Sequence, residues 1–225
     1  MVINNPSRLA FSEVEIVGIA IQPISATPPQ NHLAILYIDE SNNPKLLHIN
    51  ITGKLINNSP SNDFYWLDLG DTFDELNKNI LAAHVMKVIW ANAESTFHYG
   101  FDTETKIIDP ETGEFKKSMG GIGLTCATFV LEVFESCGMP LIKWKSWKKN
   151  QNSAIIWQRH MFEQYIRIPE IPKEVIERQQ KNVGNRRYMP EEVAAATQLV
   201  RPATRKEVKP SAKKIRDFLV NQLTA

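Results

Sequence analysis

Alternating apolar residues before position 71 restrict the fold of this 225-residue chain more than any other feature. In four short runs, Val, Ile, Leu and aromatic residues dominate, and turn-forming segments separate the runs, which is typical of β-strands. The expected strands cover residues 13–21, 32–39, 45–53 and 63–70. Because only the polar segment ESNNP separates the second run from the third, these two runs are expected to form an antiparallel hairpin.

Helical periodicity replaces this alternation after residue 70. Residues 71–94 have acidic side chains in the first turn and apolar side chains three or four positions apart, which indicates an amphipathic helix. A polar loop then leads to Cys126, where a strongly apolar run predicts a second helix that stops at Gly138 and Pro140. Strands followed by helices predict an α+β fold, with an antiparallel sheet of at least four strands packed against the Cys126 helix.

The last third of the chain consists of shorter helical segments that prolines interrupt. Residues 151–166, 191–200 and 211–223 are the expected helices, the last two with a proline near the start. We therefore expect two parts, a main domain over residues 1–150 and a helical C-terminal extension over residues 151–225. The extension is expected either to cap a cleft of the main domain or to mediate self-association.

The composition excludes several classes of protein. A net formal charge of +1 gives no general attraction to nucleic acid or acidic membranes. No apolar run reaches the ~18 residues of a membrane span, and the N-terminus has no signal-peptide pattern. Two cysteines without such a signal predict a reducing, cytoplasmic location. The common metal, phosphate-loop and dinucleotide spacings are missing from the sequence, so neither a cofactor nor a metal is expected.

Cys126 is the candidate nucleophile, because it directly follows the glycine-containing loop at 120–123 and is expected to begin a helix. A thiol on a first helical turn lies near unpaired backbone N–H groups and the positive end of the helix dipole, which lower its pKa. The same N–H groups can hold a developing oxyanion. The alternative is a buried, unreactive cysteine, a common state for free Cys. Cys137, at the other end of this helix, is expected to be structural.

A cysteine nucleophile needs a base, and the chain has five histidines. His32 is the best placed, because it opens a strand directly after a proline-rich loop. His48 lies on the next strand and has the same even parity, so an even-sum hairpin register puts both imidazoles on one face. The other three fall in expected helices or in a loop, where packed or exposed rings are common: His84, His98 and His160.

These segments resemble the circularly permuted NlpC-type papain-like hydrolases, a group that includes the lecithin:retinol acyltransferase-like and the bacterial YiiX-like proteins. The resemblance covers residues 21–140 and rests on HLAILY, LLHIN and TCATFVLEVF, with the histidines before the cysteine, the reverse of papain. It implies Cys126 as the nucleophile, His32 as the general base and acid, and His48 as the residue that orients His32. It also implies oxyanion donors in the loop before the helix, at Gly121, Gly123 and Thr125.

The orienting role depends on the hairpin register. If paired residue numbers sum to 82, His48 lies opposite Ala34, one same-face step from His32. If the turn is centred one residue later, the two histidines are four residues apart along the strand. Asn50 or Thr52 would then orient His32 instead.

The implied mechanism is covalent catalysis through a thioester. His32 takes the thiol proton, the sulfur attacks a carbonyl carbon, and an acyl-enzyme forms. The expected activity is that of a soluble cysteine peptidase or amidase that cleaves a peptide or isopeptide bond, and its partner is a peptide or acyl-containing substrate. Two alternatives remain: a thioesterase or acyltransferase with the same dyad, and a non-catalytic interaction module in which Cys126 is merely buried.

Overall fold

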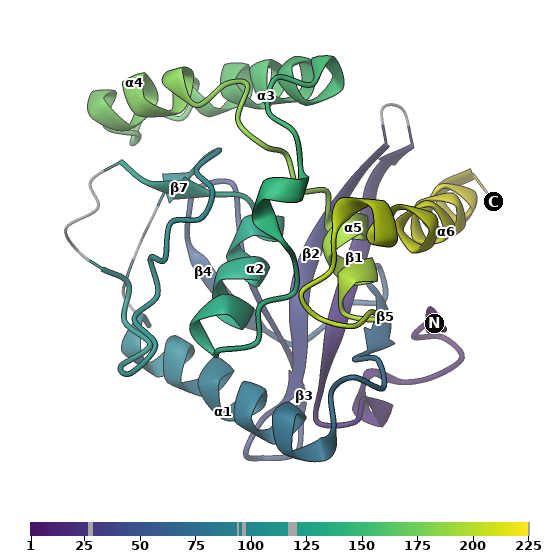
Figure 1. The fold of residues 1–225 in the computed structure, drawn as a ribbon. Coiled ribbons are helices and arrows are strands. Elements are labelled where there is room, and N and C mark those ends of the chain that lie inside the picture. The colour runs from purple at the N-terminus through teal and green to yellow at the C-terminus, as the bar shows by residue number, and fades with distance from the viewer. Residues whose placement is uncertain (27–28, 94, 96–97, 117–120, 225) are drawn as a thin grey trace.

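The computed structural model describes residues 1–26, 29–93, 95, 98–116 and 121–224 (Figure 1). Within this part of the chain, five strands form an antiparallel sheet in the order β4-β3-β2-β1-β5. Their bounds are β1 Val17–Ala26, β2 Pro29–Ile38, β3 Pro44–Ile49, β4 Leu55–Asn58 and β5 Tyr65–Asp68. A short parallel pair consists of β6 His98–Tyr99 and β7 Gly123–Leu124.

Six α-helices follow the sheet in the described part of the sequence. They are α1 Glu75–Ala91, α2 Cys126–Ser136, α3 Asn152–Tyr165, α4 Lys173–Lys181, α5 Pro190–Ala196 and α6 Arg205–Thr224, and two 3₁₀ turns cover Phe11–Glu13 and Trp144–Ser146. This confirms the predicted α+β class and its antiparallel sheet. None of the helices in the described ranges is both long and apolar enough to cross a membrane.

The third expected strand is shorter than predicted, and a further strand follows it. β3 ends at Ile49, and the side-chain oxygen of Asn50 accepts the backbone N–H groups of Thr52 and Lys54, which reverses the chain. Gly53 completes this turn with a φ of 78°, a left-handed conformation that glycine adopts without strain. β4 begins beyond the predicted range and pairs with β3. The prediction missed β4 because only two of its four residues are apolar.

The hairpin of β2 and β3 has the expected register. Leu36 pairs with Leu46, and Tyr37 pairs with Lys45, so the paired numbers sum to 82. The Asp39 carboxylate fixes the turn by accepting the backbone N–H groups of two turn residues. The position of every β3 side chain relative to β2 follows from this short turn.

The two faces of the sheet carry separate apolar clusters. Odd-numbered β2 residues such as Leu33 and Ile35 belong to the main core, to which the helices contribute. Even-numbered residues such as Ala34 and Leu36 pack with Phe64 in a smaller cluster on the opposite face. Because successive strand side chains point to opposite faces, parity decides which cluster a β2 residue joins.

The helices after residue 150 pack in two places. α5 and α6 supply Val193, Ala194, Val208 and Ile215 to the same core as the sheet and α2, and Figure 1 shows both helices beside β1. Small alanine side chains on α5 allow the close approach of this helix to β2. α3 and α4 contribute to a separate small cluster with Tyr99 and other residues. The predicted C-terminal extension thus contains one pair of peripheral helices and one pair of core helices, and the division at residue 150 stays a prediction.

Candidate active site

A capping box fixes the start of α2. The Thr125 hydroxyl accepts the backbone N–H of Thr128 at 3.2 Å, and the Thr128 hydroxyl accepts the backbone N–H of Thr125 at 2.8 Å. These reciprocal bonds satisfy two donors that a helix start otherwise leaves open. Cys126 is consequently the first residue of the helix.

The Cys126 thiol is buried, with 8 % of the residue exposed. Burial raises its pKa to about 11, although backbone hydrogen bonds from Leu33, Ala127 and Cys126 itself, and the charge of Arg187, act to lower it. The expected low thiol pKa is thus corrected, because loss of hydration outweighs the helix start and its N–H groups. At neutral pH the group is a thiol and not a thiolate.

The hydrogen bond from the Leu33 N–H places the sulfur against β2. The pairing of β2 with β3 covers Ile35 to Ile38, so the first half of β2 is paired with β1 and not with β3. The tip of α2 therefore approaches β2 where the sheet opens, immediately beside His32 in the sequence.

His32 and His48 form a pair across this opening. Nε2 of His32 lies 2.9 Å from Nδ1 of His48, and the Phe64 ring contacts both imidazoles. Burial lowers the pKa of His32 to about 4, with the neighbouring His48 adding to the effect, and burial also lowers the pKa of His48. Both rings are neutral at pH 7. The expected register therefore brings the two predicted histidines together.

Cys126 and His32 approach the site from different faces of the sheet. His32 shares the face of Ala34 and contacts Phe64, whereas Cys126 packs with Leu33 in the main core. Among the described residues no hydrogen bond joins the sulfur to either imidazole. Both residues nevertheless line one cavity of about 370 Å³. Cys126 and His32 therefore share a cavity, without the expected direct hydrogen bond between sulfur and imidazole.

Two of the three predicted oxyanion donors are already engaged. The Gly123 N–H binds Asp102 at 2.9 Å, and the Thr125 N–H belongs to the capping box. A Cβ on Gly123 would lie 2.6 Å from the Tyr99 carbonyl oxygen, so the glycine is needed for chain packing. Gly121 has a φ of 78°, and its carbonyl accepts the Gln179 amide. Gly120, the first residue of the predicted loop, lies outside the described residues.

The backbone N–H groups of Cys126 and Ala127 are the better candidates for oxyanion donors, because both lie on the first turn of α2 and act to lower the pKa of the thiol. The positive end of α2 adds to their effect on a developing negative charge. The Cys126 N–H therefore stays a predicted oxyanion donor, whereas the N–H groups of Gly123 and Thr125 are occupied by other bonds.

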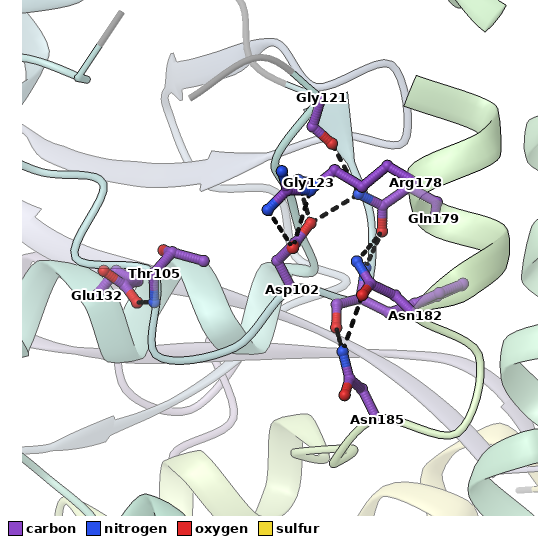
Figure 2. A network of polar contacts seen from close by, with 10 residues as sticks. Asp102, Thr105, Gly121, Gly123, Glu132, Arg178, Gln179, Asn182 and Asn185 are labelled. Atoms are coloured by element: carbon purple, nitrogen blue, oxygen red, sulfur yellow. Dashed lines mark hydrogen bonds and ion pairs between the residues drawn. The ribbon is translucent and has the colours of Figure 1, made fainter. Parts of the chain in front are cut away.

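Asp102 organises the loop before α2, and sequence reasoning did not find it. Figure 2 shows its carboxylate between the loop and α4. It accepts the Gly123 N–H, the Gln179 amide at 2.7 Å and the Arg178 guanidinium at 2.9 Å. No local pattern predicts this contact, because about 76 residues separate Asp102 from its α4 partners.

Replacing Asp102 by Ala is expected to lower the free energy of unfolding by about 2–4 kcal/mol, because the buried Gly123 and Gln179 donors lose their acceptor. The Arg178 side chain is 42 % exposed, so water can hydrate its charge and it adds little to the loss. Urea unfolding measures the change. Glu104→Ala is the control, since the Glu104 side chain is 33 % exposed against 9 % for Asp102, and the loss of its ion pair with Arg186 should cost under about 1 kcal/mol. Equal small effects of both variants would contradict the role of Asp102.

The remaining predicted residues lie elsewhere. His84 bonds the Ser136 hydroxyl at 2.8 Å and joins α1 to α2, which is a packing role. Cys137 is half-buried at the C-terminal end of α2, on the opposite end from Cys126. His98 belongs to β6, and His160 is exposed on α3.

The cavity also contains residues that no motif indicated. Arg187 lies over the Trp157 ring, with its guanidinium carbon 4.0 Å from the ring centroid. Tyr99 lines the same space, and burial raises the pKa of its hydroxyl. Within the described ranges, no three His, Cys, Asp or Glu side chains are grouped as metal ligands.

Comparison of the chain with protein-family models found no match. Comparisons with curated proteins and with solved structures also found none. Function is therefore inferred from the geometry of the described residues, and the likeness to permuted NlpC-type hydrolases stays an expectation from three short motifs.

Proposed function

We propose that the protein is a cysteine hydrolase that cleaves an amide bond, of peptide or isopeptide type, through an acyl-enzyme on Cys126. The proposal includes the permuted papain-like arrangement that the histidine and cysteine motifs resemble. One observation carries it: the thiol on the first residue of α2 lines the same cavity as His32, a neutral histidine whose ring contacts His48. A nucleophile, a base and a residue to orient the base are the parts that such chemistry needs.

The proposed mechanism uses one tautomer of the histidine pair. Nδ1 of His48 lies 2.9 Å from Nε2 of His32, so one of these two nitrogens donates to the other. A neutral His48 with its proton on Nε2 accepts at Nδ1, and the Nε2–H of His32 is then the donor. Nδ1 of His32 consequently has a free lone pair and can take a proton.

The proposed reaction has two stages, formation of the thioester and its hydrolysis. The thiol proton passes to Nδ1 of His32 as the sulfur bonds to the carbonyl carbon, and the N–H groups of Cys126 and Ala127 hold the oxyanion. The carbon–nitrogen bond breaks, the imidazolium gives its proton to the leaving amine, and a thioester remains. Water, deprotonated by His32, hydrolyses the thioester and restores the thiol.

The step requires that Nδ1 of His32 comes within hydrogen-bond reach of the sulfur when substrate fills the cavity. Catalytic hydrogen bonds are often long or misaligned in a free enzyme and tighten in the complex. The resting groups are a thiol and a neutral imidazole, because burial disfavours the charged form of both. The proton therefore moves during the attack of the sulfur, and the mechanism needs no preformed thiolate.

A substrate panel with mass spectrometry tests the proposal. The full chain is mixed with fluorogenic peptide amides and with acyl esters, quenched in acid, and mapped by peptide mass. Turnover of amides and an acyl mass increase on the Cys126 peptide, but not on the Cys137 peptide, are expected. Turnover of esters alone would replace the proposal by the thioesterase or acyltransferase alternative. No turnover and no adduct would leave the non-catalytic interaction module.

A further inference from the structure

Arg187 stands out in the cavity that Cys126 and His32 line. Among the described residues around this cavity, it is the only Asp, Glu, Lys or Arg. The Arg187 side chain is half-buried, and its guanidinium lies over the Trp157 ring. Burial lowers the pKa of Arg187 to about 10, so the group is still cationic at neutral pH.

This cation has no ion-pair partner in the part of the chain that the structure describes. The two nearest acidic residues in sequence are engaged elsewhere: Glu191 binds Arg216 at 2.8 Å, and Glu192 binds Arg205 at 3.0 Å. The charges of Glu191 and Glu192 act on Arg187, but neither carboxylate forms an ion pair or hydrogen bond with it among the described residues. A half-buried guanidinium without a bonded carboxylate is unfavourable, because its lost hydration is only partly compensated. An anion from outside the chain would complete this environment.

The rest of the cavity favours an anion with a mainly apolar body. Ile24, Ile49, Ile51 and Met161 line the cavity together with aromatic residues, and burial keeps the His32 imidazole neutral. The other polar lining residues are uncharged: Gln30, Asn31 and Thr125. A cavity of about 370 Å³ suits a small ligand. A single guanidinium matches one carboxylate through two parallel N–H···O bonds, whereas a phosphate dianion generally needs more than one cation.

We propose that Arg187 binds a carboxylate of the substrate, which is an amide with one carboxylate on an otherwise apolar body. This proposal deepens the proposed hydrolase function and rests on it, because the bound carboxylate belongs to a substrate only if the protein is a hydrolase. Arg187 and Cys126 line the same cavity. One bound molecule can therefore present its carboxylate to Arg187 and its scissile carbonyl to the thiol.

The Trp157 ring supports this role through its position beside the cation. The guanidinium carbon lies 4.0 Å from the ring centroid, and this contact limits the motion of the side chain, which reduces the freedom lost when a carboxylate binds. Both residues line the cavity, so the held guanidinium adjoins the space that a ligand would occupy.

Binding of two matched probes tests the carboxylate site without turnover. The probes are 4-phenylbutanoate and the neutral, uncleavable 4-phenylbutan-1-ol, titrated into the full chain by calorimetry. The wild-type protein is expected to bind the carboxylate at least about ten-fold more tightly than the alcohol, as a charge-assisted pair would give. Arg187→Met should remove this preference by weakening carboxylate binding and leave alcohol binding unchanged. Arg159→Met, at an exposed position on α3, should keep the preference.

Several results would overturn the proposal: equal affinity of the wild-type protein for the two probes, binding of neither, a preference that survives Arg187→Met, or the same loss in Arg159→Met. Thermal unfolding confirms that each variant is folded, and Arg187→Gln replaces the Met variant if that one is not, with the same expectation. Because the titration needs no catalysis, an inactive wild-type protein that still prefers the carboxylate would end only the hydrolase proposal. An active protein without the preference would end only the assignment of Arg187.

Discussion

Replacing Cys126 by Ala is expected to reduce turnover of amide substrates by at least about 10⁴-fold, because no other group on α2 can form the thioester. Stability should change little. The substitution removes one sulfur at the tip of the helix together with its hydrogen bond from Leu33, a loss of about 1 kcal/mol. The capping box of Thr125 and Thr128 still starts the helix. Initial rates and thermal unfolding of the same preparations check both parts.

Cys137→Ala is the matched control, since it removes a thiol from the other end of the same helix. This variant should keep wild-type turnover. If Cys126→Ala retained turnover, another residue would have to be the nucleophile. If it lost activity together with several kcal/mol of stability, packing would be the role of Cys126 and the fall in rate would follow from unfolding.

Acid is expected to destabilise the protein through its buried histidines, and His84 gives the clearest case. This residue is 5 % exposed, and burial, with a smaller effect of Lys87, lowers its pKa to about 4. An unfolded histidine has a pKa near 6.5. Between about pH 6.5 and pH 4, His84 therefore binds a proton in the unfolded chain but not in the folded protein. The free energy of unfolding should fall across this window by up to about 3 kcal/mol from His84 alone.

His84→Gln isolates this effect, because Gln can still bond the Ser136 hydroxyl but does not titrate. Between pH 6.5 and 4, the free energy of unfolding of the variant should fall by about 1.4 kcal/mol less per pH unit than that of the wild-type protein. Above pH 7 the two slopes should be the same. Urea unfolding at a series of pH values measures the slopes. His160→Gln, at an exposed position, should leave the slope unchanged. Parallel curves for wild type and His84→Gln would refute the prediction. His32 acts in the same direction, whereas the raised pKa values of Asp68 and Glu132 oppose the trend in both proteins.

The local order of the chain could be predicted from the sequence because it depends on neighbouring residues. Two-residue alternation and a short Asp39 turn determine the register of β2 and β3, and with it the pairing of His32 and His48. The glycine-containing loop and the apolar run behind it indicate a helix that starts at Cys126. The local pattern did not indicate β4, because this strand of four residues contains only two apolar side chains and directly follows the turn that the Asn50 side chain stabilises.

Only the tertiary structure decided the chemical state and the surroundings of the site. Burial, which a pattern cannot measure, makes the Cys126 thiol a weak acid despite its place on a helix start. Asp102 takes the Gly123 N–H through a contact with α4, and Arg187 reaches the cavity from beyond that helix. These residues lie tens of positions from Cys126, and their meeting depends on how whole elements pack. Sequence periodicity records which face of an element is apolar, and it does not record which distant element covers that face.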